Sequence, residues 1–388
     1  MKILRVKFDN IIIFKESFDI DLTAPDKIAE DSGVYNVWGP INTLQTLSII
    51  GINAVGKTTA LKLVRLAMEV VLNNKGLNDN LIPSVFLNKQ AEDKGILMTV
   101  YFYKDNKVYK LESKIRYKRN LENEIHFYYE EETLKSKAKS NVTNKDNIFE
   151  FTKKQNYKVI KRSKLKKDLL GVLKDDDSIA IMATRETGTT VNTMLEDVKE
   201  KINPIQGIVH KKVLNVFDEN LDKLEKIEGK DGINIEFKNS KTKIETSIIG
   251  LEDIISSGTI KGQNIIKNAM VALRNGGYLI IDELENHLNK ELVRMIINIF
   301  NNKEINKNGA CLFFTTHYAE ILDSFERKDN IYILTRDKEN FTKINRYSDL
   351  VKRNELKKSD VILSNYIKGT APKALNIRAL EEYICKNI

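Results

Sequence analysis

One eight-residue stretch has the residue types and the spacing needed to bind a phosphate group. It reads Gly51-Ile52-Asn53-Ala54-Val55-Gly56-Lys57-Thr58 and fits the pattern Gly-x-x-x-x-Gly-Lys-Thr without a mismatch. A mostly apolar run at 44–50 precedes it, and apolar residues recur at helical spacing from Leu61 to Leu72. The stretch is therefore predicted to connect a strand to the start of a helix, where backbone N–H groups and the helix dipole favour an anion.

Distinct roles in binding a nucleoside triphosphate are expected for the residues of this loop. Gly51 and Gly56 allow the backbone to approach phosphate closely. Lys57 is expected to reach the β- and γ-phosphates, and the Thr58 hydroxyl to hold Mg²⁺. The residues predicted to bind the nucleotide here are Asn53, Ala54, Val55, Gly56, Lys57, Thr58 and Thr59. The alternative is a chance match in an ordinary loop, which the order of strand, loop and helix disfavours. We expect ATP and Mg²⁺ as ligands.

Two acidic residues, Asp282 and Glu283, end a second apolar run at 278–283. Ligands of open parallel sheets bind at the carboxyl ends of the strands. Asp282 is expected to hold Mg²⁺ through water, and Glu283 to accept a proton from an attacking water. Acids at strand ends are often merely solvated, but next to a complete phosphate loop this pair predicts ATP hydrolysis.

A third apolar run, at 310–316, ends at His317, which is one of only four histidines. His317 is expected to contact the γ-phosphate or the attacking water. The alternative is a structural histidine at a strand end.

Ser256 and Gly258 precede an apolar helical pattern and form a second candidate anion site. One nucleotide does not need two γ-phosphate sites, so the second site is expected to serve the nucleotide of a partner chain. This predicts a homodimer in which two chains enclose two ATP molecules. The alternative is an ordinary serine N-cap.

Composition sets limits on the class of protein. The 388 residues are 41% hydrophobic, enough for one large or two ordinary domains. No run approaches the roughly 20 apolar residues of a membrane span, and the N-terminal residues alternate like a strand rather than a signal peptide. Cys311 and Cys385 have no metal-ligand spacing around them. We therefore expect a cytoplasmic protein without a membrane partner.

The formal net charge of +9 permits attraction to nucleic acid or to an acidic partner. A lysine-rich segment at 131–170 is the candidate surface. A solvated surface, or the base composition of the genome, explains the same lysines, so both interpretations stay open.

The pattern along the chain predicts a mixed α/β fold. The expected elements are strands in 1–23, a loop at 24–43, an antiparallel meander at 96–130, a strand at 178–183, helices in 191–227, strands at 232–238 and 242–249, and alternating strands and helices from 278 to 336. The predicted division is 1–150 as the N-terminal half of the nucleotide-binding domain, 151–230 as a basic segment and helical insert, and 231–388 as its C-terminal half. The two halves are expected to combine into one domain.

Taken in order, these motifs resemble those of an ABC-type ATPase. More narrowly, the chain resembles the OLD-like and AbiL/RloB-associated prokaryotic ATPases, which are related to SMC and DNA-repair ATPases. The residues that carry this resemblance are 255–259, 281–286 and 315–322, together with the phosphate loop. The resemblance implies an ABC-type P-loop NTPase fold with a mixed, largely parallel sheet, an antiparallel β meander and a helical insert.

The resemblance also implies particular roles. Ser256 and Gly258 would clamp the γ-phosphate bound by the other protomer, Glu283 would be the catalytic base, and His317 the switch residue. Gln90 is the candidate for the glutamine that senses Mg²⁺. One departure is Leu288-Asn289-Lys290, which stands where the family often has Leu-His-Pro.

The use of ATP is inferred from the resemblance alone. OLD-type ATPases carry a Toprim nuclease after the ATPase, and the about seventy residues after His317 are too few for such a domain. We therefore expect a separate effector protein, a nuclease, in prokaryotic antiphage defence, with DNA or a phage component as a further partner. The first alternative is a DNA-repair or SMC-like ATPase that acts directly on DNA. The second is a transporter ATPase subunit, which the β meander and the Ser-Ser-Gly-Thr signature disfavour.

Overall fold

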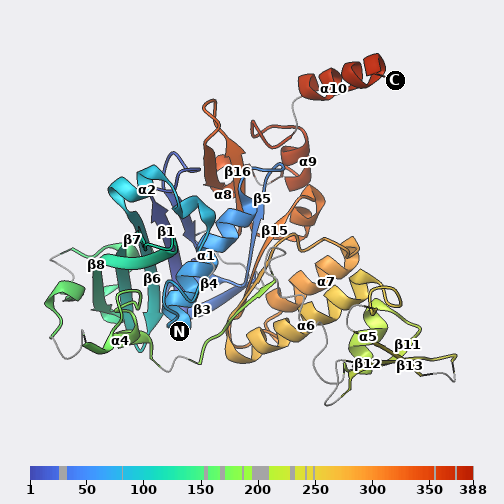
Figure 1. The fold of residues 1–388 in the computed structure, drawn as a ribbon, viewed down its shortest axis with the longest axis horizontal. Coiled ribbons are helices and arrows are strands. Elements are labelled where there is room, and N and C mark those ends of the chain that lie inside the picture. Colours follow the sequence, from blue (N-terminus) through green and yellow to red (C-terminus); the bar gives the residue numbers. More distant parts are fainter. Residues whose placement is uncertain are drawn as a thin grey trace.

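The protein folds as a mixed α/β structure that contains both parallel and antiparallel sheets (Figure 1). The computed structural model describes residues 1–25, 33–80, 82–152, 156–166, 171–185, 188–194, 209–227, 232–240, 243–247, 250–353, 355–371 and 374–387. Two sheets of six strands each dominate the described part of the chain, and a three-stranded sheet and a hairpin accompany them.

The central sheet combines strands from both ends of the sequence. Its order is β10 (Val191–Met194), β14 (Tyr278–Ile281), β15 (Cys311–Thr316), β5 (Thr46–Ile50), β16 (Ile331–Arg336) and β17 (Thr342–Arg346). Neighbouring strands from β10 to β16 are parallel, and β17 is antiparallel to β16. Because β5 lies between β15 and β16, the prediction that both ends of the chain contribute to one sheet is confirmed.

Helices cover both faces of this sheet, which explains why all five residues of β5 are buried. On one face, Leu47, Ile49 and Phe313 pack with the apolar side of α1 (Lys57–Leu72). On the other face, Leu312 and Phe314 pack with α6 (Ser257–Asn275) and α7 (Lys290–Asn301). The alternation along each strand thus divides the hydrophobic core into two layers.

The second six-stranded sheet contains the predicted antiparallel meander as β6 to β8. Its order is β2 (Phe18–Asp21), β1 (Lys2–Asp9), β6 (Ile96–Lys104), β7 (Lys107–Arg119), β8 (Ile125–Ala138) and β9 (Lys158–Lys161). Asp105 and Asn106 join β6 to β7 with φ values of 48° and 60°, which is the left-handed backbone of a two-residue hairpin. Helix α1 lies between this sheet and the central one (Figure 1), so one core holds both sheets together.

A small separate sheet packs on α6. It contains β11 (Leu221–Lys226), β12 (Gly232–Phe237) and β13 (Ile244–Ser247), and α5 (Lys211–Phe217) accompanies it at the lower right of Figure 1. Phe217 packs against Gly262 of α6 so closely that a Cβ on the glycine would lie 2.2 Å from the ring. The small sheet is therefore fixed to the first half of α6.

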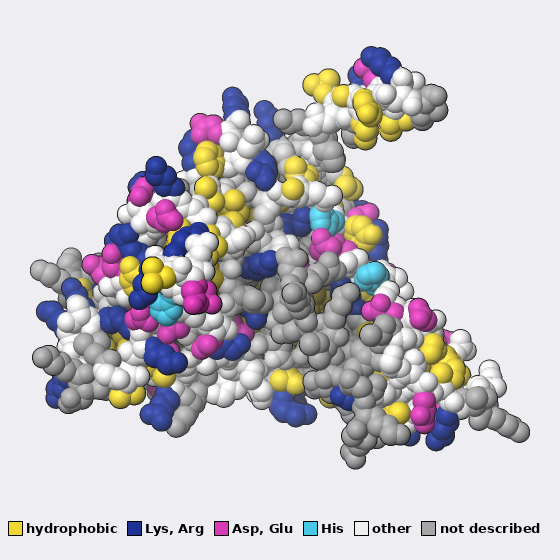
Figure 2. All heavy atoms as spheres, in the orientation of Figure 1, with side chains coloured by type: hydrophobic (Ala, Val, Ile, Leu, Met, Phe, Trp, Pro, Cys, Tyr) yellow, Lys and Arg dark blue, Asp and Glu magenta, His cyan; other side chains and the backbone are white. Residues whose placement is uncertain are grey.

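The remaining elements are short or peripheral. They are the hairpin β3 (Val34–Trp38) and β4 (Ile41–Leu44), the helices α2 (Lys89–Lys94), α4 (Ile181–Thr184), α8 (Tyr347–Leu350), α9 (Lys358–Leu363) and α10 (Ala374–Asn387), and the 3₁₀ helices Ser84–Phe86, Lys139–Asn141, Asp146–Phe149, Arg162–Lys164 and η6 (Ala319–Ser324). Helix α10 projects from the body in Figure 1, and its hydrophobic side chains are visible in Figure 2. Among the described residues, no helix combines the length and the apolar character that a membrane crossing needs.

Three sequence predictions of local structure are wrong. Residues 34–44, predicted as part of a loop, form the β3–β4 hairpin, which Trp38 anchors by stacking on Tyr103 with ring centroids 4.3 Å apart. The apolar run 178–183 forms turns and the start of α4 rather than a strand. A short apolar run fits a buried strand and a buried helix equally well, so periodicity alone could not distinguish them.

The third wrong prediction is the helical pattern at 191–227, which, among the residues described there, holds only in α5. Residues 191–194 form β10, an edge strand of the central sheet, and 221–226 form β11. A register shift between Leu221 and Lys223 places Leu221 and Leu224 on the same buried side of the strand, and that spacing of three looks helical in the sequence. The part of this prediction that covers 195–208 lies outside the described residues.

Candidate functional site

The phosphate-loop sequence forms a tight turn between β5 and α1. Gly56 is the N-cap residue of α1 with φ 102°, and Ala54 has φ 59°. A Cβ on Gly51 would lie 2.6 Å from the Leu334 carbonyl oxygen and 2.8 Å from the Val55 side chain. The two glycines of the motif are thus required for different reasons, Gly56 for its left-handed backbone and Gly51 for its close packing.

Lys57 lies at the centre of the site and is 6% exposed. Its ammonium group donates to the carbonyl oxygens of Gly51 at 2.9 Å and Ile52 at 3.2 Å, and its Nζ lies 3.4 Å from Nδ1 of His317. Burial lowers the pKa of Lys57, and the nearby carboxylates act in the opposite direction. The cation is therefore held between the loop and the acidic end of β14.

Thr58, Asp282 and Thr315 form a continuous set of hydrogen bonds. The Thr58 hydroxyl donates to Oδ2 of Asp282 at 2.5 Å, and the Thr315 hydroxyl donates to Oδ1 at 2.5 Å. The Thr315 oxygen also accepts the backbone N–H of Glu283 at 2.8 Å. One side chain on β15 therefore fixes the orientation of both acidic residues that follow β14.

Glu283 and His317 contact each other across the same edge of the sheet. Glu283 has φ 47°, a left-handed backbone that is uncommon for a residue with a side chain and that turns it away from the direction of the strand. Its Oε1 lies 3.1 Å from Nε2 of His317. Because the Lys57 ammonium can only donate, Nδ1 of His317 must accept, and the proton of a neutral imidazole is then on Nε2, which donates to Glu283.

A cavity of about 800 Å³ opens at this edge of the central sheet. The residues that line it are Asn53, Ala54, Gly56, Lys57, Thr58, Thr59, Glu283 and His317. Every one of them was predicted from the sequence as a site residue. Val55, predicted with them, points its side chain into the core and accepts the Thr342 hydroxyl on its carbonyl oxygen at 2.8 Å.

Ser256 and Gly258 lie at the start of α6 and are not among the described residues that line the cavity. Ser256 is the N-cap, and its hydroxyl oxygen accepts the Thr259 N–H at 3.1 Å. Gly258 lies against the backbone of His287, where a Cβ would be 2.4 Å from the carbonyl oxygen. Lys261, one turn into the helix, donates to the Glu283 carbonyl oxygen at 3.0 Å. The helix start is therefore tied to the acidic loop, and the predicted contact with a partner's nucleotide stays a prediction.

Gln90 lies in α2, which contacts β7 of the meander. Its side chain is outside the described part of the structure, so its predicted role in sensing Mg²⁺ stays a prediction.

Four residues that contribute to the site were not predicted. Thr315 and Glu285 contact the predicted acids and His317, while Arg336 donates to the Ala54 carbonyl oxygen and Thr342 to that of Val55. Thr315 could have been found, because polar residues at the carboxyl ends of adjacent parallel strands meet at the same edge. Arg336 and Thr342 lie far from the loop in sequence and match no motif.

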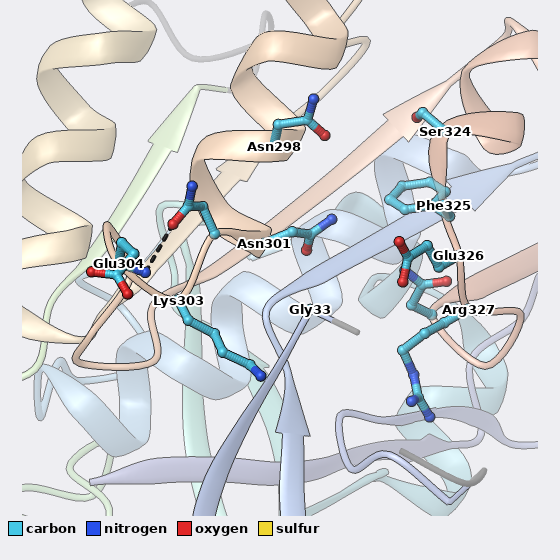
Figure 3. Close-up of a pocket in the computed structure, with 11 residues that line it drawn as sticks. Gly33, Asn298, Asn301, Lys303, Glu304, Ser324, Phe325, Glu326 and Arg327 are labelled. Carbon is cyan, nitrogen blue, oxygen red and sulfur yellow. Dashed lines mark hydrogen bonds between the residues drawn. The ribbon is translucent and has the colours of Figure 1, made fainter. Parts of the chain in front are cut away.

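A second cavity, of about 580 Å³, lies at the opposite edge of the central sheet (Figure 3). Side chains from the end of α7 and from the segment before β16 surround it, among them Asn301, Lys303, Glu326 and Arg327. The two basic and two acidic side chains in its described lining balance each other. The functional assignment therefore depends on the first cavity alone.

No protein-family model matches the chain, and no curated protein matches it significantly. The described residues also contain no group of three or more His, Cys, Asp or Glu side chains that could hold a metal ion. Mg²⁺ is usually bound by one or two protein ligands, water and substrate phosphates, so such a group is not required for it. The Thr58 hydroxyl and the Asp282 carboxylate are oxygen donors of the kind that Mg²⁺ prefers.

Proposed function

We propose that the chain is a Mg²⁺-dependent ATPase of the ABC type that binds ATP in the cavity at the start of α1. One observation carries this proposal. Lys57 and Thr58 from the first part of the chain surround the same site as Asp282, Glu283 and His317 from the last part. The volume, about 800 Å³, is in the usual range for small-molecule sites.

The residues present fit both phosphate and Mg²⁺. The glycine turn leaves room for phosphate oxygens beside the backbone, and Lys57 supplies a buried positive charge. Thr58 and Asp282, already joined at 2.5 Å, would hold the metal ion. Mg²⁺ held there would neutralise the negative charge that develops on the phosphate during transfer.

The side chains around the cavity have separate roles in the proposed hydrolysis. Glu283 takes the proton of the attacking water, and since its Oε1 accepts from His317, we assign that proton to Oε2. His317 orients the carboxylate through Nε2 and contacts Lys57 through Nδ1. Thr315 keeps Asp282 and Glu283 in fixed directions, so that the metal ligand and the base act on the same phosphate.

We further propose that two copies enclose two ATP molecules and that this cycle controls a separate effector, a nuclease in antiphage defence. The dimer is supported by the exposed Ser256 and by Gly258, which lie at a helix start outside the cavity of their own chain. The effector and the defence role are supported by the sequence resemblance only.

Direct action on DNA, the alternative, receives less support from the charges of the meander. Lys110 and Lys135 both pair with Glu112, and Lys114 and Arg116 both pair with Glu130. Figure 2 shows basic and acidic side chains interspersed over this part of the surface. In the lysine-rich segment, Arg162 forms an ion pair with the buried Glu132 at 2.9 Å and thereby stabilises the fold.

The purified wild-type chain is expected to release phosphate from ATP only with Mg²⁺. Because each complete site needs two chains, the specific rate should rise with protein concentration until dimers saturate. Phosphate release measured over a protein dilution series, with Mg²⁺ and with EDTA, checks both points. A Mg²⁺-dependent rate per chain that is constant on dilution to monomers would remove the dimer from the proposal, and no phosphate release at any concentration would remove the ATPase.

Mixing two inactive variants is expected to restore hydrolysis. Ser256→Arg places a bulky cation where the partner's γ-phosphate would bind, and Glu283→Gln removes the base. In a two-fold dimer, a mixed pair has one site with both changes and one intact site, so a 1:1 mixture should recover about a quarter of the wild-type rate. Each variant alone should stay inactive and keep the wild-type melting temperature. Absence of recovery, with mixed dimers present, would contradict the shared site.

A further inference from the structure

A second buried acid, Glu285, lies behind the cavity and has no role in the chemistry proposed above. The residue is 7% exposed. Its Oε1 accepts the backbone N–H of His317 at 2.5 Å, while Oε2 is buried without a hydrogen-bond partner among the described residues. A buried carboxylate with an unsatisfied oxygen is unfavourable, so its presence next to the site needs a physical reason.

The geometry of the loop between β14 and α7 gives a reason for this buried carboxylate. Two carboxylates of this loop hold His317 at its two ends, because Glu283 contacts the imidazole and Glu285 the main chain. His317 is the first residue after β15, where the strand's own hydrogen-bonded ladder stops. Its backbone direction therefore depends on the contact with Glu285, and the imidazole must also lie within reach of Lys57 and Glu283.

We propose that Glu285 is a positioning residue that fixes the main chain at His317 by accepting its N–H. The imidazole then spans Lys57 and Glu283 in one tautomer, with the proton on Nε2. The effect on His317 is independent of the function proposed above, and the effect on the hydrolysis rate rests on that function.

Two conservative variants distinguish a positioning role of Glu285 from a role of its negative charge. Glu285→Gln keeps a carbonyl oxygen at the same reach and removes the charge. Glu285→Asp keeps the charge and shortens the side chain by one methylene, which withdraws the acceptor from the His317 N–H. Glu291→Gln on α7 is the matched control, since Glu291 is exposed and pairs with Arg294 one turn further along the same helix.

Hydrolysis should distinguish these variants if Glu285 acts by positioning. We expect Glu285→Asp to lower kcat by about 10- to 100-fold, the size of effect that a small misplacement of a catalytic group produces, with little change in KM for ATP. Glu285→Gln should stay within about threefold of the wild type, because an amide oxygen replaces the acceptor.

A spectroscopic test reports on His317 directly and does not require activity. Selective ¹⁵N labelling of histidine gives signals from only four residues, and His317→Gln assigns those of His317. In the wild type and in Glu285→Gln, we expect a downfield amide proton and the Nε2–H tautomer. In Glu285→Asp, the amide proton should move upfield and the tautomer signature should be lost.

The outcomes separate the two proposals. If the wild type does not hydrolyse ATP, the ATPase proposal fails, while the histidine spectra still test the role of Glu285. The positioning role is overturned if Glu285→Gln is impaired and Glu285→Asp is not, which would indicate that the charge is what matters. It is also overturned if both variants keep, or both lose, the wild-type signals of His317. The melting temperature of each variant shows that the comparison is made on folded protein.

Discussion

A Glu283→Gln variant is expected to bind ATP with wild-type affinity and to hydrolyse it about 10²- to 10⁴-fold more slowly, the usual contribution of a general base. Glutamine keeps the size of the side chain and an oxygen that can accept from Nε2 of His317 at the observed 3.1 Å. It cannot take the proton of an attacking water. Binding should persist because Lys57, Thr58 and the loop are unchanged.

In the proposed dimer, hydrolysis opens the shared site, so this variant should also accumulate as an ATP-bound dimer. Size-exclusion chromatography with multi-angle light scattering, with ATP and Mg²⁺ present, measures that population, and single-turnover phosphate release measures the chemical step. Glu320→Gln is the matched control, because Glu320 is a half-exposed acid shortly after His317 that pairs with Lys290. Normal turnover by Glu283→Gln would mean that another group is the base.

Replacing Lys57 by alanine should abolish measurable ATP binding. The ammonium group donates two hydrogen bonds within the loop and contacts Nδ1 of His317, and Lys57 is 6% exposed, so its charge acts on phosphate oxygens with little screening by water. Each hydrogen bond from a charged donor contributes about 1.5–3 kcal/mol, and losing two of them to phosphate lowers affinity by at least about 100-fold.

Isothermal titration calorimetry or a fluorescent ATP analogue measures this loss. Lys62→Ala on the same helix is the matched control, because Lys62 is not among the described residues that line the cavity. The carbonyl oxygens of Gly51 and Ile52 lose a donor in Lys57→Ala, so thermal unfolding without nucleotide should be recorded for both variants. If Lys57→Ala binds ATP as the wild type does, the loop is not the phosphate site.

The sequence was most informative where a motif lies on strongly patterned strands and helices. The order of apolar run, glycine loop and helix predicted β5 and α1. Two apolar runs ending in polar residues predicted the carboxyl ends of β14 and β15, and Ser256 and Gly258 before an apolar helical pattern predicted the start of α6. Parallel strands place such ends at one edge, which is why Lys57, Asp282 and His317 could be expected together.

Other features depend on contacts between distant residues that have no local signature. The bulge in β11 mimics a helical spacing, and the hairpin at 34–44 depends on Trp38 stacking on a strand of another sheet. The sequence assigned no site role to Glu285, and only the fold brings it to the His317 N–H. The projection of helix α10 from the body was also not predicted, because it has no local signature in the sequence.

The insertion of β5 between β15 and β16 has a consequence for biosynthesis. A chain emerging from the ribosome presents β5 and α1 early, yet neither hydrogen-bonding edge of β5 gains its partner until the last third has been translated. Contacts this distant in sequence form slowly and leave an apolar strand open to wrong pairing in the meantime. Nascent protein therefore acquires its phosphate loop late, and a ribosome-stalled N-terminal fragment should depend on chaperones to stay free of aggregation.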